Sequence, residues 1–174
     1  MLVVAATDRE LARLDGIDTL CCGVGPVEAA ARVAARLATQ RPEAVLHVGI
    51  AGSRTLEPLT VVLGSIAVYE DFRTAFPVVD HVEPDEALLA RARAWLPEAP
   101  VLPIGTSASV GGTKRCEVEA MEGFGVLRAC ALAGVPAVEL RVVANSPDEP
   151  DRAKWRIEDA LGVLAVQLDR LDVL

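Results

Sequence analysis

The chain has 174 residues, of which 52% are hydrophobic and 24% charged, so it can bury the core of one domain spanning residues 1–174. Its formal net charge of −8 excludes a broad electrostatic affinity for nucleic acid or for an anionic membrane surface. No apolar run is long enough to span a bilayer, and Asp8, Arg9 and Glu10 interrupt the apolar start MLVVAA. We therefore expect no signal peptide and a cytoplasmic location.

Short apolar runs alternate with longer amphipathic segments along the chain. The runs of Val, Ile and Leu are typical of buried strands, and the amphipathic segments are typical of helices. In chain order we expect a strand at 2–6, a short helix from about Arg9, a strand at 18–25, a helix from Pro26, a strand at 44–52, one long strand or two at 60–72, a helix at 84–96, a strand at 101–110, a helix from Glu119 to Gly134, a strand at 136–145 and a helix at 151–171. This alternation predicts an α/β fold, a three-layer α/β/α sandwich around a mixed, mostly parallel sheet.

Several common types of site are not supported by the sequence. The four cysteines include no C-x-x-C pair, and His47 and His81 are far apart, so we expect buried thiols, no metal and no cofactor. The motifs of P-loop NTPases and of G-x-S-x-G hydrolases are absent from the sequence. The segment GVGPVE carries Glu28 where a dinucleotide-binding fingerprint has its third glycine, which favours an ordinary turn before a helix over NAD binding.

Acidic and amide side chains follow the predicted strands, where ligands bind in α/β sheets. Asp8 and Glu10 follow the first strand, Glu122 follows a later one, and Asn145 ends the last. Each alone has an ordinary interpretation as a solvated, turn or capping residue. Glu119 and Glu122 would share one face of a helix that starts at Glu119, near its positive end.

Segments spread along almost the whole chain resemble, in the right order, motifs of the nucleoside phosphorylase and nucleosidase superfamily. They are AATDRELARL, GVGPVEAA, HVGIAGS, GSIAVYEDF, EAMEG and ELRVVAN. The segment NSPDEPDRAKWRI most resembles the futalosine hydrolases within that superfamily. The resemblance implies cleavage of a purine–ribose N-glycosidic bond. For the futalosine hydrolases it implies release of hypoxanthine and dehypoxanthinyl futalosine in menaquinone biosynthesis.

The resemblance also implies roles for particular residues. Glu122 would hold the ribose hydroxyls with Met121 packing beneath the sugar, and Glu10 would activate the attacking water, with Asp8 as the alternative. Asn145 stands where nucleosidases that act on adenine carry an aspartate. An amide both donates and accepts hydrogen bonds, which suits the O6, N7 and N1 edge of a 6-oxopurine. The group that protonates the leaving base stays open, with water as one candidate.

Backbone and aromatic contacts to the substrate complete the expected site. Ala51 and Gly52 would let the substrate approach the backbone closely. Phe124, Phe72 and Trp155 are alternatives for stacking on the purine, and we include Phe124 among the expected substrate-binding residues.

Hydrolysis is favoured over phosphorolysis. The glycine turn at 23–25 corresponds to the phosphate site of the phosphorylases, but Pro26 removes one backbone donor from it and no arginine lies beside it. The alternatives are a purine nucleoside phosphorylase acting on a 6-oxopurine nucleoside and a non-catalytic nucleoside-binding domain. The expected partner is a small-molecule purine nucleoside. A homo-oligomer is also implied by the resemblance, with residues 76–81 as the loop that would cover a neighbour's substrate.

Overall fold

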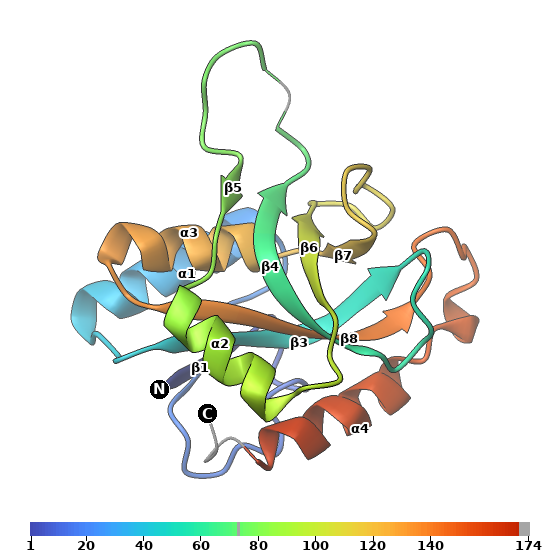
Figure 1. Ribbon diagram of the computed structural model, residues 1–174, viewed down its shortest axis with the longest axis horizontal. Helices are drawn as coiled ribbons and strands as arrows, with labels where there is room; N and C mark the ends of the chain where they lie inside the picture. The colour runs from blue at the N-terminus through green and yellow to red at the C-terminus, as the bar shows by residue number, and fades with distance from the viewer. Residues whose placement is uncertain (73, 171–174) are drawn as a thin grey trace.

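The computed structural model describes residues 1–72 and 74–170. Its centre is an eight-stranded sheet with helices on both sides (Figure 1). The strands are β1 (Leu2–Ala5), β2 (Thr19–Cys21), β3 (Val45–Ser53), β4 (Val61–Tyr69), β5 (His81–Val82), β6 (Val101–Thr106), β7 (Val118–Ala120) and β8 (Ala137–Asn145). The helices are α1 (Pro26–Thr39), α2 (Glu86–Trp95), α3 (Gly123–Ala133), the short 3-10 helix η1 (Arg152–Lys154) and α4 (Ile157–Leu168).

The sheet is mixed and mostly parallel, as the sequence predicts. The parallel pairs are β1 with β2 and β3, β3 with β8, and β6 with β4 and β7. The antiparallel pairs are β3 with β7, β4 with β8, and β4 with β5. Strands β3, β7, β6, β4 and β8 therefore form a closed ring, which the sequence did not predict. Every strand of the ring contributes to one small apolar cluster, made of Ala51, Val62, Ile104, Val118, Ala120 and Val143.

Two helical layers cover the sheet, and each has its own apolar core. Helices α1 and α3 pack together on one side, and α2 and α4 lie on the other (Figure 1). The buried residues of α1 recur every three or four positions, which gives it one apolar face. The three-layer prediction is therefore confirmed. None of the helices in the described part of the chain is long and apolar enough to cross a membrane.

The predicted helix from Arg9 is wrong, because residues 6–13 form bends and turns. The Glu10 carboxylate accepts hydrogen bonds from the backbone N–H and the hydroxyl of Thr7, which closes a turn after β1. This turn keeps Glu10 next to the end of the strand.

The predicted helix start at Glu119 is also wrong. Glu119 lies in β7, which pairs with both β3 and β6, and α3 begins only at Gly123. Pairing on both sides outweighs the local preference of Glu, Ala and Met for helix. Glu119 and Glu122 are therefore not on one helical face.

Smaller differences concern the ends of elements. The final helix begins at Ile157 because Asp151 caps the separate turn η1 by accepting from the N–H of Ala153 at 3.0 Å. Its predicted end at residue 171 lies outside the described residues. The segment at 60–72 contains one strand, β4, with a register shift beyond Gly64.

Candidate active site

A cavity of about 270 Å³ lies at the carboxyl ends of β1, β3 and β8. Residues from both ends of the chain and from its middle line this cavity. The predicted site residues that it brings together are Glu10, Ala51, Gly52, Met121, Glu122 and Asn145. The sequence-based site is therefore one contiguous surface in the structure, apart from Phe124.

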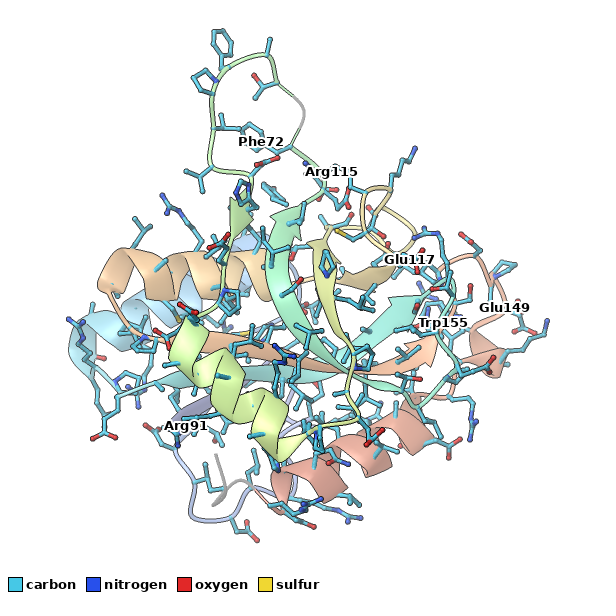
Figure 2. All side chains as sticks on the ribbon, in the orientation of Figure 1. Phe72, Arg91, Arg115, Glu117, Glu149 and Trp155 are labelled. Carbon is cyan, nitrogen blue, oxygen red and sulfur yellow. The ribbon has the colours of Figure 1, made fainter. Side chains whose placement is uncertain are left out.

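Among residues 1–72 and 74–170, the aromatic side chain that lines this cavity is that of Trp155, not Phe124. Phe124 stacks on Tyr69 with ring centroids 5.1 Å apart, and Phe72 packs against the same tyrosine at 5.9 Å. The indole N–H of Trp155 donates to the backbone oxygen of Glu149 at 3.1 Å, and the two side chains lie near each other in Figure 2. The structure therefore does not bring Phe124 to the cavity, because its ring is used in packing against β4.

Glu10 is held firmly in the cavity wall. Its Oε2 accepts from the N–H and hydroxyl of Thr7 at 2.9 and 2.8 Å, and its Oε1 accepts from the N–H of Ile50 at 3.1 Å. Only 8% of Glu10 is exposed. Asp8 is exposed and lies outside the lining of the cavity. Of the two carboxylates that the sequence offered, Glu10 is the one that faces the cavity.

Glu122 is the residue that precedes α3, but its side chain does not cap that helix. Its Oε1 accepts from the N–H of Gly25 at 3.0 Å, and its Oε2 lies 3.6 Å from Nη2 of Arg141. Burial raises the pKa of Glu122 above that of an ordinary glutamate, and the Arg141 guanidinium opposes this rise. Only 4% of Glu122 is exposed, and the residue lines the cavity, so its carboxylate does not lie in bulk solvent.

We expect the raised pKa of Glu122 to appear in the pH dependence of binding for any ligand that its charged carboxylate binds. A carboxyl group is charged above its pKa and neutral below it. Because the pKa of Glu122 is raised, its charge is lost at a higher pH than that of an ordinary glutamate. A pH profile of kcat/KM should show this acid limb, and Glu122→Gln should abolish it. An acid limb that survives in the variant would show that a group other than Glu122 causes it.

A buried ionic network beneath the cavity was missed by the sequence analysis. Arg141 is 1% exposed, and its Nε donates to Oε1 of Glu139 at 2.8 Å. Its Nη2 contacts Nε2 of His47, whose Nδ1 lies 3.0 Å from the backbone oxygen of Val4. Burial lowers the pKa of His47 well below its usual value, so the neutral ring donates through Nδ1 and accepts from Arg141.

The signal for this network was present in strand β8. The alternating charged pair in AVELRVVAN places Glu139 and Arg141 on one face of an otherwise apolar strand. Buried charges require partners, so this pattern indicates an internal ion pair. Gly49 makes room for the network, because a Cβ atom there would collide with both Arg141 and Glu10.

Glu119 is a second residue that the sequence analysis placed wrongly. It lines the cavity and is 4% exposed. Its Oε1 accepts from the N–H of Gly111 at 2.6 Å, and its Oε2 accepts from the N–H and hydroxyl of Thr113 at 2.9 and 2.7 Å. The carboxylate therefore shapes the loop after β6, whose Val110 also lines the cavity.

The chain belongs to the phosphorylase superfamily, whose family model matches residues 19–172. It is 35% identical over 190 residues to futalosine hydrolase from Streptomyces coelicolor, covering 90% of this chain and 79% of that relative. It is 29% identical over 178 residues to futalosine hydrolase from Thermus thermophilus, covering 86% of this chain and 78% of that relative. The resemblance seen in the sequence motifs is thus confirmed.

Solved structures show the same fold at lower identity. A futalosine hydrolase mutant from Helicobacter pylori matches with a TM-score of 0.89 and 18% identity, over 99% of this chain and 98% of that one. A mutant of the Helicobacter pylori protein MTAN, with 5′-methylthioadenosine in its active site, matches with a TM-score of 0.88 and 18% identity over the same shares.

Proposed function

We propose that this protein hydrolyses the N-glycosidic bond of a purine nucleoside, and that futalosine is split into hypoxanthine and dehypoxanthinyl futalosine. The observation that carries the proposal is that Glu10, Glu122 and Asn145, from three distant segments, line one cavity. The similarity to two futalosine hydrolases supports this choice of substrate. The reaction would then serve menaquinone biosynthesis in the cytoplasm.

Glu122 is the group that binds the sugar. Breaking the bond builds positive charge on the ribose and negative charge on the departing base. A carboxylate accepts hydrogen bonds from both hydroxyls of a cis-diol and stabilises the nearby cation. Gly25 and Arg141 fix the orientation of Glu122, and Met121 packs beneath the sugar.

Glu10 is the general base for the attacking water. Thr7 and Ile50 fix both of its oxygens, but Oε1 accepts only one hydrogen bond from the protein and so retains acceptor capacity for a water proton. The activated water adds to the anomeric carbon as the base departs.

Changing Glu10 to Gln should lower kcat by about 10²- to 10⁴-fold, because an amide cannot take up the water proton. The matched control is Asp8→Asn, which removes an exposed carboxylate two residues away and should leave kcat unchanged. Single-turnover kinetics of base release would measure both. A large loss in Asp8→Asn with none in Glu10→Gln would reverse the assignment.

Asn145 binds the oxygen-bearing edge of the base. It ends β8 beside Gly52, and Ala51 and Gly52 form the adjoining wall on β3. An amide donates to O6 or N7 of a 6-oxopurine without being a proton donor for the leaving base. This chemistry favours hypoxanthine over adenine.

Hydrolysis is favoured over phosphorolysis because the glycine turn at 23–25 has few free backbone donors for a phosphate. The N–H of Gly25 is already donated to Glu122, and Pro26 has no N–H to offer. The one basic side chain among the described lining residues is Arg9, which pairs with Glu158. A phosphate nucleophile would therefore find few free donors here.

Chromatography of the base released from futalosine, inosine and methylthioadenosine, with and without phosphate, tests the proposal. We expect hypoxanthine from futalosine in the absence of phosphate. Release that depends on phosphate would show a phosphorylase instead. No release from any nucleoside would show a non-catalytic binding domain.

We also propose a homo-oligomer in which residues 76–81 cover a neighbour's substrate. These residues belong to the connection between β4 and β5, which projects far beyond the helices and the sheet (Figure 1). Arg115 and Phe72 lie toward the end of this connection that is nearer the sheet (Figure 2). Arg115 donates a hydrogen bond to Asp80 at 2.8 Å, just before β5, while Phe76 is 79% exposed. The exposed apolar side chain suits burial against a second copy.

A further inference from the structure

Glu139 is a buried carboxylate that has no role in the proposed mechanism as described so far. It is 1% exposed, and Nε of Arg141 donates to its Oε1 at 2.8 Å. Taking two charges out of water is costly, and a well-packed apolar pair of similar volume often stabilises a fold as well or better. Stability alone therefore does not explain an ion pair at this place, directly beneath the cavity.

The guanidinium of Arg141 is held at all three of its nitrogens. Besides the contact of Nε with Glu139, Nη2 contacts Nε2 of His47, and Nη1 donates to the backbone oxygen of Ile50 at 3.5 Å. A planar guanidinium with an acceptor at each nitrogen has a fixed orientation. Of these three acceptors Glu139 is the charged one, because the ring of His47 is neutral.

The outer nitrogens of the same guanidinium lie beside both carboxylates of the proposed mechanism. Nη2 lies 3.6 Å from Oε2 of Glu122. Nη1 and Oε1 of Glu10 lie beside the same point over Gly49, since one Cβ atom there would collide with both. The backbone of Ile50 links the two groups as well, because its oxygen accepts from Arg141 and its N–H donates to Glu10. A shift of the guanidinium would therefore disturb Glu122 and Glu10 together.

The side chain of Glu139 is confined by two glycines on other elements. A Cβ atom at Gly123, the first residue of α3, would lie 2.7 Å from Cδ of Glu139. A Cβ atom at Gly64 on β4 would lie 3.2 Å from Cβ of Glu139. The carboxylate thus occupies space that a side chain at position 123 would take, and it is packed into place toward Arg141.

The charges of the network agree with this arrangement. Burial acts to lower the pKa of Arg141, but the carboxylates of Glu139, Glu122 and Glu10 raise it, and the net shift is upward. Glu139 contributes most among these three carboxylates. The guanidinium is therefore charged in the fold, and its principal counter-ion is the residue furthest from the substrate.

We propose that Glu139 is a positioning residue, which holds the guanidinium of Arg141 so that Glu122 and Glu10 keep their orientation toward the sugar and the attacking water. This inference rests on the proposed function, to which it adds a residue that touches no substrate. Glu139 acts through Arg141, because it is not among the described residues that line the cavity. Without it, Arg141 is free to turn toward Glu122 and draw that carboxylate out of place.

Binding of formycin B tests this role by calorimetry without requiring turnover, because the carbon–carbon bond between its 6-oxopurine-like base and its ribose is not hydrolysed. Glu139→Met and Glu139→Gln are a matched pair. Both remove the charge and keep most of the volume, but only glutamine keeps an oxygen that accepts from Nε of Arg141. Glu139→Met should weaken binding of formycin B by at least about tenfold, since the ribose loses a well-oriented charged acceptor. Glu139→Gln should stay within about threefold of wild type, because the hydrogen bond is retained.

Free hypoxanthine separates positioning from a general loss of structure. It carries no ribose, so Glu139→Met and Glu139→Gln should bind it as tightly as wild type does. If Glu139→Met does not fold, Glu139→Asp takes its place, because it keeps the charge but withdraws the carboxylate from Nε. It should show the same selective loss of formycin B binding. The values of kcat/KM for futalosine should follow the same order as the affinities for formycin B.

Three results would overturn the inference: wild-type affinity for formycin B in Glu139→Met, an equal loss in Glu139→Gln, or equal weakening of formycin B and hypoxanthine. Wild-type kcat/KM for futalosine in a folded Glu139→Met variant would also overturn it, and would leave the proposed function standing. Binding of formycin B that depends on Glu139, in a protein that cleaves no nucleoside, would overturn the proposed function alone.

Discussion

Replacing Glu122 with Gln should lower kcat/KM for nucleoside hydrolysis by about 10²- to 10³-fold and leave the fold intact. In the proposed mechanism, the amide loses the negative charge that faces the developing cation and cannot accept from both ribose hydroxyls as a carboxylate does. Its oxygen can still accept from the N–H of Gly25, so the packing around α3 is retained. Steady-state kinetics with thermal unfolding of the same preparation measures both effects.

The matched control is Glu43→Gln, which removes the charge of an exposed glutamate in the connection between α1 and β3. It should leave both kcat/KM and the unfolding temperature unchanged. Wild-type turnover in a folded Glu122→Gln variant would remove Glu122 from the mechanism.

Arg141→Met should have the largest effect on stability, lowering the free energy of unfolding by about 3–5 kcal/mol. The change leaves Glu139 and Glu122 buried without their guanidinium and removes the donor to His47. The expected loss comes from uncompensated charge, not from lost volume, because methionine fills much of the same space. Urea denaturation followed by circular dichroism measures this change.

Two further variants isolate the cause of that loss. Arg9→Met breaks the ion pair with Glu158, whose side chains are 59% and 81% exposed, and should change stability by no more than about 1 kcal/mol. The double variant Arg141→Met/Glu139→Gln should recover at least about 1 kcal/mol relative to Arg141→Met, because one unpaired buried charge is gone. Equal losses in the arginine variants would show that the buried network contributes little.

The order and type of most elements could be predicted because their patterns are local. The α1 segment carries its apolar residues on one face, and Asp85 caps α2 by accepting from the N–H of Leu88 at 2.9 Å. Strand β7 could not be predicted, because Glu119 and Ala120 favour helix and the pairing with β3 and β6 makes the segment a strand. The closed ring depends on the same long-range pairing.

The lining of the cavity was predicted in part, and the reason differs from residue to residue. Glu10, Glu122 and Asn145 follow strand ends, and the family resemblance singled them out. The choice of Glu10 over Asp8 on the cavity depends on a turn closed by Thr7, which no periodicity reveals. Phe124 was misplaced because its contact with Tyr69 joins segments distant in sequence.

The cavity joins the turn after β1 to Trp155 and to α4, so its walls come from segments that are far apart in the sequence and are made at different times during synthesis. A nascent chain on the ribosome therefore carries the N-terminal wall before the facing wall exists. The complete cavity exists only after α4 has left the exit tunnel, so a nucleoside would stabilise chains that include α4 and no shorter translation intermediate.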